Sequence, residues 1–115
     1  MGILIVYTPE FLRKSKRYNK KYKSYKNDLK KFIDNIENEN GIHIANSIYK
    51  YRLAVKSKNK GKSGGFRVLT HEIILHDNSK EKITLVTIWD KNDKENISDK
   101  ELKEILKNNN ISSKI

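Results

Sequence analysis

Near residue 48 the apolar side chains of this chain change their spacing, and this change constrains the fold most strongly. Upstream, one stripe at helical spacing consists of Tyr25, Leu29, Phe32, Ile33 and Ile36. From Ile48 to Val55 the period is two, because apolar side chains alternate with basic or small ones. A helical segment followed by alternating segments predicts an α+β fold, and 115 residues fit one domain.

Two helices are expected in the first third of the chain, after a short buried strand from Ile3 to Tyr7. Thr8 is placed to cap the first helix, which should run from Pro9 to about Tyr18. The apolar stripe predicts the second helix between Tyr22 and Asn38, and Asn40-Gly41 is a stop signal after it.

Three consecutive strands are expected in the second half: Ile48–Val55, Phe66–Leu75 and Lys82–Trp89. Their short connections favour an antiparallel meander. Ser98 and Glu101 then form a capping box that starts a last helix, with residues 109–115 expected to fray. The prediction is one domain over residues 1–115, in which a helix pair packs on an antiparallel sheet of three or four strands and a short C-terminal helix follows.

The formal net charge of +11 predicts attraction to a polyanion or an acidic partner, although abundant Lys and Asn also fit a compositional bias. Local segregation is stronger evidence, because no carboxylate occurs between Glu39 and Glu72. The basic residues of this interval are Lys50, Arg52, Lys56, Lys58, Lys60, Lys62 and Arg67. Basic residues also cover the expected helices from Arg13 to Lys31, where they suit ribosomal RNA or simple solubility.

A glycine-rich stretch lies inside the acid-free interval, from Lys60 to Gly65. Glycine allows a turn and a close approach of the backbone to a ligand, and the surrounding cations suit phosphate. We expect Arg52, Lys60 and Lys62 to contact the RNA backbone; a solvated loop is the alternative. The stretch lacks the spacing of a nucleotide-binding P-loop.

Several classes of site are disfavoured by composition. The chain has no cysteine, so disulfides and thiolate metal sites are excluded, and its three histidines have no metal-ligand spacing. We therefore expect neither a metal nor a cofactor. No apolar run is long enough to span a membrane, and the N-terminal run lacks the features of a signal peptide, so the cytoplasm is expected.

Two motifs, Gly-Gly-Phe-Arg at 64–67 and Lys-Asn-Asp-Lys-Glu-Asn at 91–96, resemble those of RelE/HigB-type toxins from bacterial toxin–antitoxin modules. The resemblance extends from about Pro9 to Leu106. It implies a RelE-like fold and a ribosome-dependent mRNA endonuclease that cuts in the A site. It also implies 16S rRNA, messenger RNA and a cognate antitoxin, acidic or of helix-turn-helix type, as partners. A ParE-like gyrase inhibitor and a non-catalytic RNA-binding module remain alternatives, and the oligomeric state stays open.

The resemblance implies that Arg67 contacts the scissile phosphate. Strand alternation also directs its side chain away from the core that Phe66 and Val68 enter; a structural pairing with Glu72 is the alternative. Lys91 and Lys94 match basic positions of the family and suggest phosphate binding, with one of them as a candidate proton donor; a solvated loop is the alternative.

Glu95 and Asp93 are candidate bases for the ribose 2′-OH, or else contacts for the antitoxin or the helix dipole. The best-known RelE pattern has a tyrosine near Ser98, so base or stacking duties here fall to Glu95 or Trp89. Trp89 suits stacking on a base, with core packing as the alternative. His71 titrates in the useful range, but a lone strand histidine is more often structural.

Overall fold

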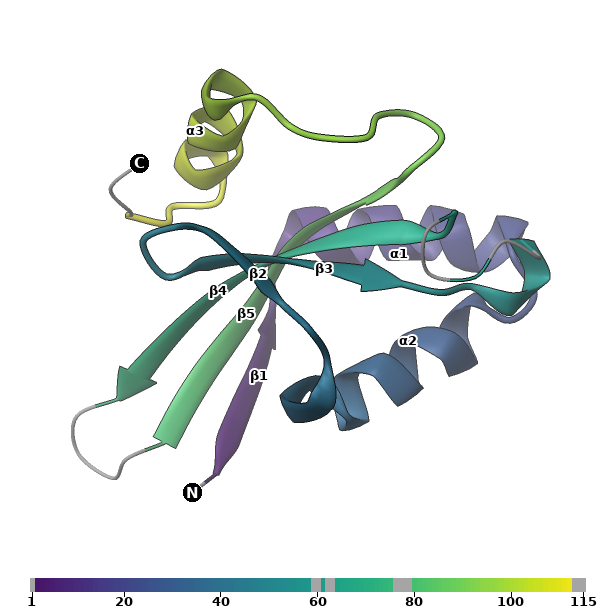
Figure 1. Cartoon of the computed structure of the whole chain (residues 1–115), viewed down its shortest axis with the longest axis horizontal. Coiled ribbons are helices and arrows are strands. Elements are labelled where there is room, and N and C mark those ends of the chain that lie inside the picture. Colours follow the sequence, from purple (N-terminus) through teal and green to yellow (C-terminus); the bar gives the residue numbers. More distant parts are fainter. Residues whose placement is uncertain (1, 59–60, 62–63, 76–79, 113–115) are drawn as a thin grey trace.

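The computed structural model describes residues 2–58, 61, 64–75 and 80–112. Its strands are β1 (Ile3–Tyr7), β2 (Ile42–Ala45), β3 (Ile48–Leu53), β4 (Phe66–Leu75) and β5 (Lys80–Asp90). Its helices are α1 (Pro9–Lys21), α2 (Tyr25–Asp34) and α3 (Asp99–Asn108), with short 3₁₀ turns η1 (Ile36–Asn38) and η2 (Lys56–Lys58). The strands form one sheet in the order β1-β5-β4-β3-β2 (Figure 1), and no helix in these ranges is long and apolar enough to cross a membrane.

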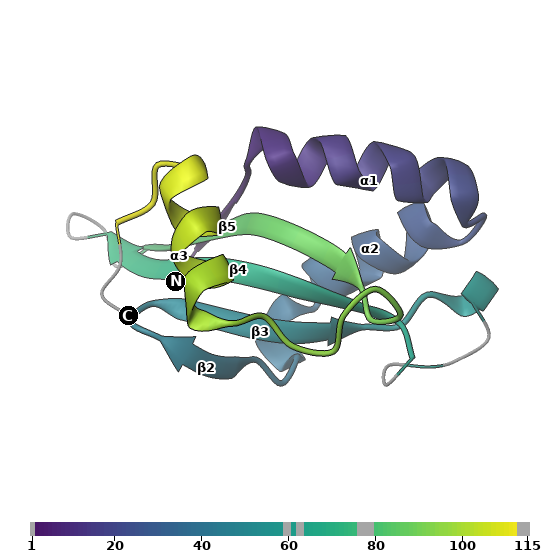
Figure 2. The same cartoon turned by 90° about the horizontal axis from the view of Figure 1, so that it is seen from above.

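The helices lie on both faces of the sheet (Figure 2). Val68 packs in one apolar cluster with Phe11 of α1 and Tyr25 of α2. Its neighbour Leu69 packs in a second cluster with Leu102 of α3. Because successive strand residues point to opposite faces, α3 covers the face opposite to α1 and α2.

The predicted α+β class is confirmed, but the expected antiparallel sheet of three or four strands is wrong. The sheet has five strands and is mixed, because β1 pairs in parallel with β5. The buried strand expected at the N-terminus is an edge strand, in which Leu4 is 41% exposed. β2 was not predicted because it is four residues long, mostly open to solvent and interrupted by a register shift after His43.

The helix boundaries also differ from those predicted. α1 continues to Lys21, and Tyr22 ends it by adopting an extended backbone while its N–H donates to Tyr18 O at 2.8 Å. α2 begins at Tyr25 and ends at Asp34, after which Asn35 leaves the helical conformation. The apolar stripe continues through η1, which explains why periodicity alone suggested one longer helix.

Phe66 anchors the strand that carries the candidate site. Its ring is fully buried and lies 4.5, 5.6 and 5.7 Å, between centroids, from the rings of Tyr18, Tyr22 and Tyr25. These edge-on contacts join α1 and α2 to the first residue of β4. The position of Arg67, the next residue, is therefore fixed by packing on the opposite face.

Candidate functional site

Arg67 lies in a row of three side chains that crosses the sheet. It is directly opposite Arg52 on β3 and Trp89 on β5. Residues opposite each other in antiparallel strands project from the same face, which here is the face covered by α3. The two arginines therefore come from neighbouring strands and bring two positive charges to one place.

Arg67 points away from Phe66 and Val68, as alternation predicts, but it is only 2% exposed. Its Nη1 donates to Phe66 O at 3.2 Å. Burial lowers the pKa of Arg67, the charge of Arg52 lowers it further, and Glu95 acts in the opposite direction. Arginine nevertheless remains charged, so the row concentrates positive charge in a partly desolvated place where an anion is strongly attracted.

The segment after β5 is held beside the start of β4. The Lys91 N–H donates to Gly65 O at 3.1 Å, which joins the two sequence motifs through the backbone. The Lys91 ammonium lies 3.3 Å from Glu95 Oε2. The structure thus brings Lys91 and Glu95 together near Arg67, although they are far from it in sequence.

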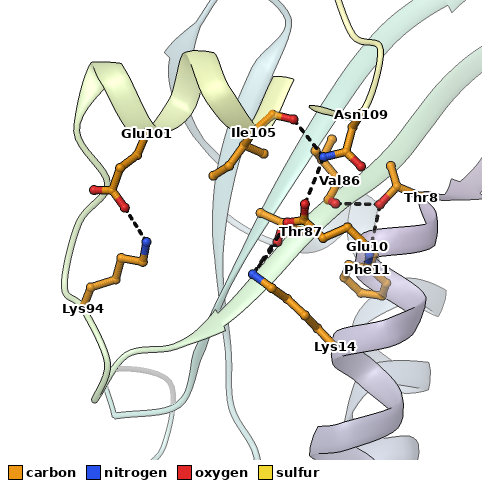
Figure 3. A network of polar contacts seen from close by, with 10 residues as sticks. All are labelled: Thr8, Glu10, Phe11, Lys14, Val86, Thr87, Lys94, Glu101, Ile105 and Asn109. Atoms are coloured by element: carbon orange, nitrogen blue, oxygen red, sulfur yellow. Dashed lines mark hydrogen bonds and ion pairs between the residues drawn. The ribbon is translucent and has the colours of Figure 1, made fainter. Parts of the chain in front are cut away.

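Lys94 is joined both to Trp89 and to α3. Its ammonium lies 2.5 Å from Glu101 Oε2 (Figure 3) and 6.0 Å from the centroid of the Trp89 ring. Trp89 Nε1 donates to Lys94 O at 3.2 Å, and the ring is only 4% exposed within the second apolar cluster. The Trp89 ring therefore packs beneath the Lys94 side chain and is turned away from solvent.

Glu101 has two roles at the start of α3. It completes the predicted capping box, because its side chain accepts from the Ser98 backbone while Ser98 Oγ accepts from its N–H. Its hydrogen bond from Lys94, followed by that from Ser98, lowers the pKa of Glu101. Moving the start of α3 would therefore also release Lys94.

Two further lysines face this region and were given no role in the site by the sequence analysis. Lys14 Nζ reaches from α1 to Thr87 Oγ1 at 3.0 Å and to Glu10 at 3.6 Å (Figure 3). Burial lowers the pKa of Lys14 despite the charge of Glu10, and Lys94 lowers it as well. Lys50 is two residues from Arg52 on β3, and its ammonium donates to Asn96 Oδ1 at 3.1 Å. Period-two spacing with Arg52 was the available signal for Lys50. Lys14 was expected only as one of the basic residues that cover the helices.

Lys58 belongs to the basic interval from which we predicted polyanion binding, but its charge is turned inward. Its ammonium pairs with Asp90, and the two side chains are only 3% and 9% exposed. Lys58 is therefore not available to RNA in this conformation and adds no charge to the surface. No local sequence signal could join it to a carboxylate so distant in the chain.

The remaining candidates are spread more widely. Lys60 and Lys62 lie outside the described residues. Asp93 is exposed in the turn after β5, where its N–H donates to Asp90 O at 2.9 Å. His71 lies farther along β4, opposite Ile48 and Thr84, and burial followed by the charge of Lys82 lowers its pKa. Among the residues in the described ranges, no group of three or more histidines and carboxylates is arranged to hold a metal ion.

The sequence matches the family described as "RelE toxin of RelE / RelB toxin-antitoxin system" over residues 11–114. A search of curated proteins gave no match. The matched region covers most of the chain and contains every candidate residue predicted from the sequence. The chain belongs to the RelE toxin family of toxin–antitoxin systems.

Proposed function

We propose that this toxin is a ribosome-dependent mRNA endoribonuclease that cuts messenger in the A site and stops translation in the cytoplasm. The observation that carries the proposal is the convergence of two distant motifs. Arg52 and Arg67 lie on adjacent strands, and the Gly65–Lys91 hydrogen bond brings the Lys91–Glu95 segment beside them. Converging cations are what a transition state with developing phosphate charge requires.

In the proposed reaction the ribose 2′-OH attacks the adjacent phosphorus and the bond to the 5′-oxygen breaks. The products are a 2′,3′-cyclic phosphate and a 5′-hydroxyl. The bound RNA displaces the side chains that leave Arg67 only 2% exposed, and Arg67 then stabilises the non-bridging oxygens while Arg52 and Lys50 hold the neighbouring backbone phosphates. Glu95 accepts the 2′-OH proton, and Lys91 or Lys94 donates a proton to the leaving oxygen.

The ion pairs seen in the free protein have a consequence for this scheme. Glu95 is paired with Lys91, and Lys94 with Glu101. A phosphate that binds the lysines competes with both carboxylates, and its arrival frees Glu95 to act as a base. Substrate binding thus separates the acid from the base at the moment both are needed.

The antitoxin is proposed to carry an acidic segment, because the net charge of the toxin is +11 and complementary charge speeds association. α3 is the element such a segment would displace. Its apolar contact rests mainly on Leu102 and Leu106, and its polar ties are Lys94–Glu101 and Asn109–Glu10, the latter at 3.3 Å (Figure 3).

The test compares wild type, Arg67→Ala and Lys103→Ala after controlled expression in bacteria. Lys103 is an exposed α3 residue whose replacement removes the same charge away from the row, and it serves as the matched control. We expect immediate loss of methionine incorporation with wild type and Lys103→Ala, and little loss with Arg67→Ala. Induction of the DNA-damage response without early translational arrest would instead favour gyrase inhibition.

A further inference from the structure

The buried pair of Lys58 and Asp90 is surrounded by aromatic rings. The Lys58 ammonium lies 4.9 Å from the ring centroid of Phe66 and 5.6 Å from that of Tyr22. The Tyr22 hydroxyl donates to Asp90 Oδ2 at 3.2 Å. Removing two charges from water is costly, and a protein is often equally stable when apolar residues of similar volume replace a buried ion pair. Stability alone is therefore a weak reason for the pair.

Asp90 organises the turn that carries Lys91 and Lys94. Its Oδ1 accepts from the Asn92 N–H at 2.9 Å, and its backbone oxygen accepts from the Asp93 N–H at 2.9 Å. Burial alone would raise the pKa of Asp90, but hydrogen bonds from Lys58, Asn92 and Tyr22 outweigh it and keep the pKa low. The carboxylate stays ionised and continues to accept all of these bonds.

Lys58 is the last residue of η2, which is fixed to α2 at two points. The Lys56 N–H donates to Asp28 Oδ2 and the Ser57 N–H to Ser24 Oγ, both at 2.8 Å. The ion pair therefore ties an anchored turn at one end to the Lys91–Glu95 segment at the other.

The Lys58–Asp90 pair lies on the opposite face of the sheet from Arg67, so it does not contact the row of Arg52, Arg67 and Trp89 directly. Asp90 is directly opposite Phe66, so both project from the face that α1 and α2 cover. Arg67, the next residue, projects from the other face. Any influence of the pair on a bound RNA must therefore pass through the backbone it holds.

We propose that Lys58 and Asp90 are positioning residues, which hold η2 and the Lys91–Glu95 segment in the geometry that cleavage needs. The inference rests on the proposed endoribonuclease function. It predicts that the pair contributes more to the cleavage rate than to folding stability.

The experiment uses Lys58→Met, Asp90→Asn and the double variant K58M/D90N. Each single change leaves one buried charge without its partner and should lower the melting temperature. The double variant has no buried charge, so its stability should recover most of that loss. The controls for the melting temperature are Lys30→Met and Asp34→Asn, which break an exposed pair whose side chains are 74% and 56% exposed.

Two readouts are made at a temperature where every variant is folded. The first is the single-turnover cleavage rate on saturating programmed ribosomes, which should fall about 10²-fold in the double variant, as a small misplacement of catalytic groups produces. The second is amide hydrogen exchange at Lys91, Asn92 and Asp93, which should speed up about tenfold while β5 amides such as Leu85 keep their protection.

A double variant with wild-type cleavage, or with unchanged exchange at residues 91–93, would overturn the inference and leave the pair with a structural role only. The exchange readout is independent of RNA. If the wild type cuts no messenger but the exchange at these amides rises as expected, the endoribonuclease proposal fails while the positioning role of the pair stands.

Discussion

Gly65→Ala tests whether the glycine-rich motif is needed for strand packing or for ligand approach. A Cβ atom at this position would lie 2.1 Å from Leu53 O, 3.1 Å from Leu53 C and 3.2 Å from Ala54 Cα. Ordinary contacts begin at 3.4 Å, so the start of β4 and the end of β3 must separate by about 1.3 Å. Backbone atoms cannot rotate away as a flexible side chain can, and Gly65 O would also move from the Lys91 N–H.

The expected cost follows from these two effects. Overpacking of this kind costs roughly 1–3 kcal/mol, and weakening the Gly65–Lys91 hydrogen bond adds about 1 kcal/mol. We therefore expect a loss of about 2–4 kcal/mol. An unfolding entropy of about 2.1 cal/mol/K per residue gives roughly 0.24 kcal/mol/K for 115 residues. The melting temperature should fall by about 8–17 °C.

Differential scanning calorimetry of Gly65→Ala and Gly61→Ala measures this directly. Gly61 has a φ of +61°, and no atom of the described residues lies within 4 Å of the place a Cβ would take, so its replacement meets conformational strain alone. That strain costs about 1–2 kcal/mol. A Gly65→Ala protein that melts as Gly61→Ala does, or close to wild type, would refute the packing explanation and favour a role in ligand approach.

Three further predictions concern titration and charge geometry. Burial raises the pKa of Tyr25 to about 12, so its neutral form stabilises the fold below pH 10 and this contribution is lost as pH rises from about 10 to 12. Urea unfolding should show a falling free energy of unfolding across that range, and the fall should be smaller in Tyr25→Phe. The hydrogen bond from Lys94 lowers the pKa of Glu101, so the ionised carboxylate stabilises the fold above the ordinary glutamate pKa and this stabilisation is lost as pH falls through the lowered value. The difference in melting temperature between wild type and Glu101→Gln should therefore be smaller at pH 3 than at pH 7. Arg67→Lys keeps the charge but loses the planar fork, and its single-turnover cleavage rate should fall about 10²-fold with the melting temperature nearly unchanged.

Local signals in the sequence predicted several elements correctly. The bounds of β4 match those expected, Thr8 caps α1 by accepting from the Phe11 N–H, and the Ser98 capping box starts α3. Each depends on residues close together in the chain. The parallel pairing of β1 with β5 was not predictable in the same way, because it joins residues nearly 80 positions apart through contacts that no local pattern specifies.

The same distinction applies to the candidate site. Alternation predicted the face from which Arg67 projects, but its burial depends on the residues that folding packs around it, which is a tertiary effect. The inward turn of Lys58 depends on Asp90, 32 residues away. The sequence around Lys58 contains no carboxylate, so only the folded structure shows that this lysine has a partner and is not available to RNA.

The central claim is that Arg67 supports cleavage of messenger in the ribosomal A site, and primer extension on programmed ribosomes tests it most directly. Purified wild type, Arg67→Ala and Lys103→Ala are each incubated with ribosomes carrying a defined messenger, and with the same RNA alone. We expect a cut within the A-site codon that requires the ribosome, is retained by Lys103→Ala and is lost with Arg67→Ala. No cut on any programmed ribosome, or an undiminished cut by a folded Arg67→Ala protein, would contradict the account.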